Sequence, residues 1–267
     1  MMQEVDFFIW ALAGLTVMGA AGIQVLTGFG FSLLAIPLLL HLFPSREAIL
    51  ISMILSMFTL LLQSKKIKDD ARWDLVWRLV IIGLPGLIFG VLVSDYIPLY
   101  NLKGLIGLIL LGYLLFQWFN NRKIDDENKK ISNSNENTPK GFYILGVLAG
   151  ILTGMIGLPG PLVVIIFIDF LPRDIFRATL VFYFIVQYLM ALILVFIFQN
   201  HFLSYDLFLI TILLIIPTFI GFLIAFPLRK LINEKFFKKV VYSLLLWIGL
   251  YSSWEFIINH ISLSLHL

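Results

Sequence analysis

The chain has 267 residues, of which 60% are hydrophobic and 13% are charged, and its mean hydropathy is +0.99. A soluble domain averages about 25% charged residues, so the composition excludes a soluble fold and predicts an all-α membrane protein with several spans. Because the chain has no cysteine, disulfides, thiol catalysis and cysteine metal sites are excluded as well.

The apolar segments of the first half occupy residues 6–26, 29–43, 47–63, 74–94 and 97–119. Because residues 1–6 carry two acidic side chains and no basic one, we expect the first segment to be a mature membrane helix rather than a signal peptide. Residues 120–140 are polar and are predicted to form a flexible linker. The apolar segments of the second half occupy residues 141–156, 160–171, 175–199, 205–226 and 240–258.

Each half contains a glycine-rich break in its apolar sequence, at residues 22–32 (GIQVLTGFGFS) and 150–161 (GILTGMIGLPGP). Lipid offers no hydrogen bonds, so non-helical backbone at membrane depth is buried in protein or lines a cavity. New helices starting near Leu33 and Leu162 would direct unpaired N–H groups and positive dipole ends at an anion. Glycine also serves tight helix packing, but paired breaks in two halves favour the substrate site of a transporter.

The two halves also share the order of their other markers. Nine residues separate an aromatic-Asp-Leu triplet at residues 73–75 from Pro85, and nine residues also separate a triplet at 205–207 from Pro217. We therefore predict two repeats of five helical segments each, at 1–119 and 141–267, joined by the linker. An odd number of segments per repeat gives the two repeats inverted topologies.

Lysine and arginine distribution predicts the orientation. If the first pair of segments in each repeat enters the membrane and returns, 16 basic residues fall in loops on one side and only 2, Arg46 and Lys103, on the other. If each broken region spans the membrane once, the count is 9 against 9. Because cytoplasmic loops carry the excess of basic residues, the first arrangement is favoured, with re-entrant broken pairs, a cytoplasmic linker and both termini outside.

The residues predicted to bind substrate lie in or near the two breaks, with one on segment 175–199. They are Gln24, Thr27, Gly28, Gly30, Ser32, Thr153, Gly157, Gly160, Pro161 and Gln187. Backbone N–H groups are expected to do most of the binding, with Gln24, Thr27 and Thr153 adding side-chain donors. Three further polar residues at helical spacing, Ser52, Ser56 and Thr59, either line a path or bond between helices. Arg173 and Arg177 either attract anions at the cytoplasmic mouth or anchor the topology.

Ionisable side chains are confined to the ends of the predicted segments. A proton relay or a metal-cation site would need acidic or histidine side chains in mid-span, so a neutral cavity for a small anion is favoured. No histidine lies deep enough to activate a serine, and we expect a protein that is not an enzyme. We expect no cofactor, no metal and no nucleic-acid partner, only a small anionic substrate and the lipid bilayer.

Residues 24–37 (QVLTGFGFSLLAIP) resemble the first-repeat signature of the sulfite and organosulfonate exporter family TauE/SafE, and residues 150–161 resemble its second-repeat counterpart. The resemblance extends over essentially the whole chain. It implies transport of sulfite, thiosulfate or small organosulfonates. Members of the family differ in direction, some exporting and some importing, and we predict an exporter. The chain departs from the commoner pattern at Ser32, where glycine is frequent, and at Pro159.

The sequence thus predicts a multi-pass secondary transporter of a bacterial inner (plasma) membrane. It would work by alternating access around a site near the midplane of the bilayer. Two alternatives stay open: a passive anion channel, and a membrane protein with an assembly or regulatory role that transports nothing.

Overall fold

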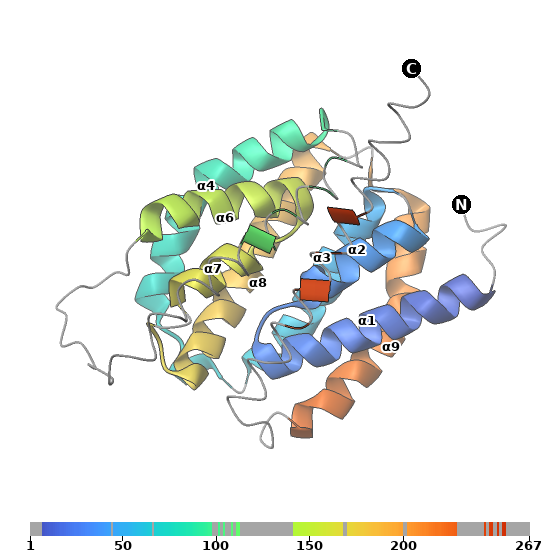
Figure 1. The fold of residues 1–267 in the computed structure, drawn as a ribbon, viewed down its shortest axis with the longest axis horizontal. Coiled ribbons are helices and arrows are strands. Elements are labelled where there is room, and N and C mark those ends of the chain that lie inside the picture. The colour runs from blue at the N-terminus through green and yellow to red at the C-terminus, as the bar shows by residue number, and fades with distance from the viewer. Residues whose placement is uncertain are drawn as a thin grey trace.

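The computed structural model describes residues 7–43, 45–65, 67–97, 141–167, 170–199 and 202–228, with isolated positions within 101–112 and 243–254. The predicted linker 120–140 lies outside the described residues, and the predicted segments 97–119 and 240–258 are described at no more than isolated positions. The elements of the described ranges are all helical (Figure 1). They are α1 (Phe7–Thr27), α2 (Phe31–Leu42), α3 (Glu47–Ser64), η1 (Lys68–Asp70), α4 (Trp73–Ser94), α6 (Phe142–Ile156), α7 (Gly160–Phe167), α8 (Arg173–Phe198) and α9 (Tyr205–Leu228).

Eight predicted apolar segments are thereby confirmed as helices, and their ends agree with the prediction to within a few residues. Five of these helices, α1, α3, α4, α8 and α9, are long and apolar enough to cross a bilayer, whereas α2 and α6 are shorter apolar helices. A 20-residue helix is about 30 Å long, which matches the thickness of the hydrocarbon layer. The described part of the chain is therefore a multi-pass membrane protein.

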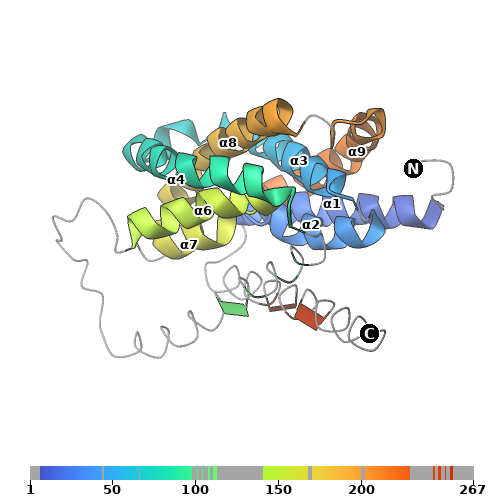
Figure 2. The ribbon, with the colours of Figure 1, turned by 90° about the horizontal axis from the view of Figure 1, so that it is seen from above.

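Figures 1 and 2 show how the described helices are arranged. Helix α1 packs along α9, and α4 packs along α6. Figure 2 shows α3, α8 and α9 on one side of the molecule and α1, α2, α6 and α7 on the other. Helices α3 and α8 contact each other, and each contacts helices from both halves of the chain. The two glycine-rich breaks contact this pair, because Gly28 packs against Arg177 of α8 and Gly157 packs against Met53 of α3.

Glycine brings the backbones of α4 and α6 into direct contact. A Cβ atom added to Gly150 would lie 2.0 Å from the carbonyl oxygen of Gly83, and one added to Gly86 would lie 2.2 Å from that of Val147. The α1–α9 pair has a similar contact, because a Cβ on Gly221 would lie 2.1 Å from the carbonyl oxygen of Met18. Small residues permit this close approach in membrane helices, where packing rather than the hydrophobic effect drives association.

Candidate functional site

The break in the first half separates α1 from α2 by three residues. Gly28 (φ 84°) and Gly30 (φ 99°) both adopt left-handed backbone conformations, which glycine tolerates without steric cost. The Thr27 hydroxyl donates to the carbonyl oxygens of Ile23 and Phe29, and the N–H of Phe29 donates back to it at 3.1 Å. Thr27 therefore closes the turn through backbone contacts.

The break in the second half also follows a helix that ends at a left-handed glycine. Helix α6 ends before Gly157, whose φ of 67° is again left-handed, a common way for glycine to end a helix. The Thr153 hydroxyl donates to the carbonyl oxygen of Ala149 at 2.7 Å, so it is engaged with its own helix. Helix α7 begins at Gly160, and Pro161 occupies its first turn, where the missing N–H costs no hydrogen bond.

The two breaks meet at one small cavity, which we call the central cavity. It is lined by Gln24, Gly30, Ser32, Leu33, Ser56, Leu158, Pro159, Gly160, Phe184 and Tyr188. The lining includes Gly30 and Ser32 at the start of α2 and Gly160, the first residue of α7, so the N-terminal ends of both helices border the same space. In this conformation the cavity has room for roughly one water-sized molecule.

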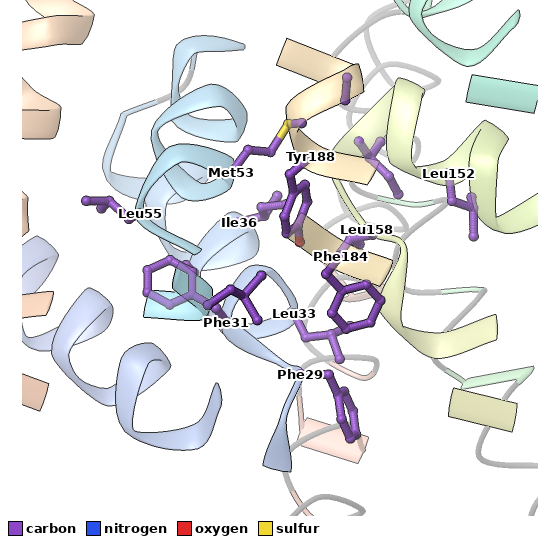
Figure 3. Close-up of a cluster of buried hydrophobic side chains, with 14 of the residues drawn as sticks. Phe29, Phe31, Leu33, Ile36, Met53, Leu55, Leu152, Leu158, Phe184 and Tyr188 are labelled. Atoms are coloured by element: carbon purple, nitrogen blue, oxygen red, sulfur yellow. The ribbon is translucent and has the colours of Figure 1, made fainter. Parts of the chain in front are cut away.

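Apolar side chains form much of the wall of the central cavity. Figure 3 shows Leu33 from the first half and Leu158, Phe184 and Tyr188 from the second half gathered in one cluster. Phe29 packs edge-on against Phe176, with ring centroids 6.4 Å apart. These contacts make the surroundings of the cavity apolar, which strengthens any polar interaction formed inside it.

The polar groups of the central cavity hydrogen-bond to one another. The side-chain amide of Gln24 donates to Ser56 Oγ at 2.8 Å and accepts a bond from the hydroxyl of Thr59. Ser32 Oγ lies 2.8 Å from the hydroxyl of Tyr188, and either atom can be the donor. These side chains are at most 3% exposed. Hydroxyl and amide groups of this kind can rotate to donate to an anion instead.

A second set of contacts ties Ser32 to neighbouring helices. The hydroxyl of Ser52 donates to Ser32 Oγ at 3.4 Å, and the hydroxyl of Tyr188 donates to the carbonyl oxygen of Gly157 at 3.3 Å. Tyr188 thus connects the start of α2 with the end of α6. The sequence left it open whether Ser52, Ser56 and Thr59 line a path or bond between helices. Ser56 does both, since it lines the cavity and accepts from Gln24.

The structure divides the predicted site residues of the two breaks into two groups. Gln24, Gly30, Ser32 and Gly160 line the central cavity. Thr27, Gly28, Thr153, Gly157 and Pro161 are buried and shape the two breaks without lining the cavity. Their contribution is to the backbone geometry that presents the helix N-termini.

Gln187 lies away from the central cavity. Its side-chain nitrogen lies 3.2 Å from the position that a Cβ atom on Gly83 of α4 would occupy. The side chain is fully buried, and among the described residues neither of its amide atoms has a hydrogen-bond partner. The sequence shows that a polar residue lies within α8, but it does not show toward which neighbour the helix turns that residue.

Ser56 and Tyr188 are the polar lining residues that the sequence-based site omits. Ser56 could be found from its place in the polar series on α3. Two members of that series, Ser56 and Thr59, hydrogen-bond to Gln24. Tyr188 follows Phe184 by one helical turn, and both residues face the cavity from α8. That spacing marks one face of a helix, but an aromatic pair on a membrane helix more commonly signals packing.

Arg177 is buried at the end of α1 rather than exposed at a membrane surface. Its side chain is 3% exposed and donates to the carbonyl oxygen of Leu26. Gly28 makes room for it, because a Cβ atom there would lie 2.8 Å from Arg177 Cγ. A cation at the C-terminus of a helix is stabilised by the helix dipole. Arg177 therefore holds the first break in place.

The electrostatic character of the central cavity suits an anion. Among the described residues that line it, none carries a carboxylate, imidazole or thiol group. The first N–H groups of α2 and α7 have no partner within their helices, and the helix dipoles add positive potential at the same point. Hydroxyl and amide donors from α1, α2, α3 and α8 complete a neutral, donor-rich space.

Comparison with known protein families gave a match over most of the chain. Residues 12–252 match the family described as sulfite exporter TauE/SafE. Neither the curated proteins nor the solved structures gave a match to the chain. The matched region contains both breaks and all the described helices except the start of α1. The chain therefore belongs to the sulfite exporter TauE/SafE family of membrane anion transporters.

Proposed function

We propose that this protein is a secondary transporter, most readily an exporter, of sulfite, thiosulfate or a small organosulfonate. The observation that supports the proposal best is the meeting of two helix N-termini, those of α2 and α7, at one neutral cavity. Oriented N–H groups and helix dipoles bind anions at such positions in many proteins. The hydroxyls of Ser32, Ser56 and Tyr188 would supply further donors.

An oxyanion of sulfur fits this set of donors by its chemistry. Its oxygens are hydrogen-bond acceptors that point in several directions, so helix ends on opposite sides and hydroxyls between them can be used together. The apolar wall formed by Leu33, Leu158 and Phe184 would face the sulfur atom or a short organic group. The family match favours sulfur anions over other anions of similar size.

We further propose that the two halves are inverted repeats, 1–119 and 141–267, joined by a cytoplasmic linker at 120–140. The helix contacts support this arrangement, because exchanging α1–α4 with α6–α9 maps the contacts onto one another. The α1–α9 pair becomes α6–α4, the α3–α9 pair becomes α8–α4, and the α3–α8 pair becomes itself. Inverted repeats place the shared site near the middle of the membrane, with re-entrant first pairs and both termini outside.

Alternating access is the transport mode that we propose. The central cavity admits roughly one water-sized molecule, which is less than any sulfur oxyanion needs. The conformation is therefore closed around the site, and the surrounding helices must separate to admit the anion. The glycine contacts between α4 and α6 and between α1 and α9 make these pairs compact units. Such units can move against the rest of the protein as bodies.

Reconstitution into proteoliposomes tests the proposal. We expect uptake of radiolabelled sulfite or thiosulfate that saturates with concentration and is accelerated by unlabelled anion on the opposite side. Conductance far above carrier rates, without trans-acceleration, would instead indicate an anion channel. No anion-dependent thermal stabilisation and no uptake across sulfite, thiosulfate, sulfoacetate and isethionate would overturn the proposed function.

A further inference from the structure

A second and larger cavity lies next to the central one, and we call it the vestibule. Its lining includes Arg46, Met53, Ser94, Gly157 and Gln199. Gly157 lines the vestibule and contacts Tyr188, which lines the central cavity. From the vestibule, Met53 packs on Gly157, with Cγ 2.9 Å from the position of an added Cβ atom. From the central cavity, the hydroxyl of Tyr188 donates to its carbonyl oxygen at 3.3 Å. Figure 3 includes both Met53 and Tyr188.

Three helices end at the vestibule. Helix α4 ends at Ser94, α6 ends just before Gly157, and α8 ends just before Gln199, and each of these residues lines the vestibule. The C-terminal end of a helix carries a negative partial charge from its unpaired carbonyl groups. The carboxylate of Asp95, which follows α4, adds a full negative charge. Without a cation, this vestibule would repel an anion.

Arg46 supplies that cation. Among the described residues that line the vestibule, it carries the only positive charge. Its side chain is 17% exposed, Nη1 lies 3.8 Å from Asp95 Oδ1, and the guanidinium lies 5.7 Å from the centroid of the Phe202 ring. It also donates to the carbonyl oxygen of Ile97. These contacts hold the guanidinium at the vestibule instead of leaving it free in solvent.

The partner carboxylate is restrained from another side. The side-chain amide of Gln199 donates to Asp95 Oδ1 at 2.9 Å and to Ser94 Oγ at 2.7 Å. Asp95 itself is not among the residues that line the vestibule. The lining therefore presents the guanidinium and not the carboxylate.

We propose that the vestibule is a transient binding site for the transported oxyanion, and that Arg46 determines its selectivity for anions. The anion binds beside Arg46 and then passes Met53 and Gly157 to the central cavity, or leaves by the same route. This inference rests on the proposed anion transport. It adds Arg46 to the proposed transport site. Arg46 lies outside the two glycine-rich breaks, at the end of the molecule opposite Arg177.

Transport kinetics of the full chain in proteoliposomes test this proposal, with radiolabelled sulfite as the probe. Arg46→Gln should raise KM about tenfold or more, since local charge concentrates ions by such factors, while the maximal rate changes less than KM. Arg46→Lys should keep most of the wild-type KM. Arg72→Gln is the matched control, because Arg72 is also paired with a nearby aspartate, Asp74 at 2.7 Å, but does not line the vestibule.

Asp95→Asn separates an electrostatic role from a structural one. The asparagine keeps an oxygen that can accept from Gln199 but removes the negative charge, so KM should equal or fall below the wild-type value. If the only role of Arg46 is to hold the start of α3 against Asp95, Asp95→Asn should impair transport as Arg46→Gln does. Measured against the wild type, Asp95→Asn still tests the proposal even if Arg46→Gln does not fold.

Ionic strength provides an independent readout. KM of the wild type should rise with salt, and that of Arg46→Gln should rise less. A KM of Arg46→Gln within twofold of the Arg72→Gln value, or impaired transport in Asp95→Asn, would overturn the vestibule site while leaving the central site intact. A wild-type protein that neither binds nor transports sulfite, thiosulfate or sulfonates would overturn the proposed function and this inference with it.

Discussion

Gly160→Ala should abolish most anion binding without unfolding the protein. A Cβ atom on Gly160 would lie 3.8 Å from Phe29 Cδ2 and 4.0 Å from Phe184 Cζ, which is ordinary van der Waals contact. The methyl group therefore fits the closed conformation. It occupies part of a cavity that already has room for only about one water-sized molecule, at the point where α7 begins.

The expected loss of affinity follows from the cost of overpacking. An extra methyl group in a packed site costs about 1–3 kcal/mol, which corresponds to about a 5- to 150-fold higher Kd. The assay is thermal stabilisation of the purified protein by sulfite and by the related anions. At a concentration of 100 times the wild-type Kd, binding stabilises the protein by about 2.7 kcal/mol, and a tenfold weaker Kd reduces this to about 1.4 kcal/mol.

Gly14→Ala is the control for this measurement. Its Cβ atom would lie 3.7 Å and 3.8 Å from two side-chain atoms of Pro217, so it has nearly the same clearance as Gly160 but faces α9. The free energy of unfolding of each variant should lie within about 1 kcal/mol of the wild-type value. Equal anion stabilisation in Gly160→Ala, Gly14→Ala and the wild type would refute the placement of the site.

Three further substitutions test other parts of the structure. Gly150→Ala should destabilise the protein by about 3 kcal/mol in denaturant unfolding, because its Cβ atom would lie 2.0 Å from the carbonyl oxygen of Gly83; an unchanged midpoint would contradict the close α4–α6 contact. Tyr188→Phe should weaken anion binding about tenfold by calorimetry, because it removes the hydroxyl that lies 2.8 Å from Ser32 Oγ; an unchanged Kd would remove Tyr188 from the site. Gln187→Leu should leave stability unchanged or raise it by about 1 kcal/mol, because its amide is buried without a hydrogen-bond partner among the described residues. Loss of anion binding in Gln187→Leu would indicate that Gln187 belongs to the anion-binding site after all.

The helices could be predicted because their signals are local. Runs of apolar residues as long as a bilayer is thick indicate helices wherever they occur. Gly28 and Gly157 both adopt left-handed conformations that end their helices, and a conformation that favours glycine can be anticipated from the glycine itself. Pro161 similarly indicates the first turn of α7.

The contacts between helices could not be predicted in the same way. A single sequence shows that Gln187 and Tyr188 are polar or amphipathic, but the rotation of α8 decides that Tyr188 faces the central cavity and Gln187 faces Gly83. Arg177 lies near the start of α8, where basic residues usually anchor a helix at the membrane surface. Only the three-dimensional arrangement brings the end of α1 to it and buries it.

The most direct test of the central claim is to locate a bound anion. Selenite is a heavier analogue of sulfite, and its anomalous scattering places the selenium atom in a crystal. We predict a peak between the first turns of α2 and α7, close enough to Ser32 and Ser56 for the selenite oxygens to accept hydrogen bonds from their hydroxyls. A crystal that holds selenite at a concentration saturating for transport, but shows no peak between these helices, would contradict the account.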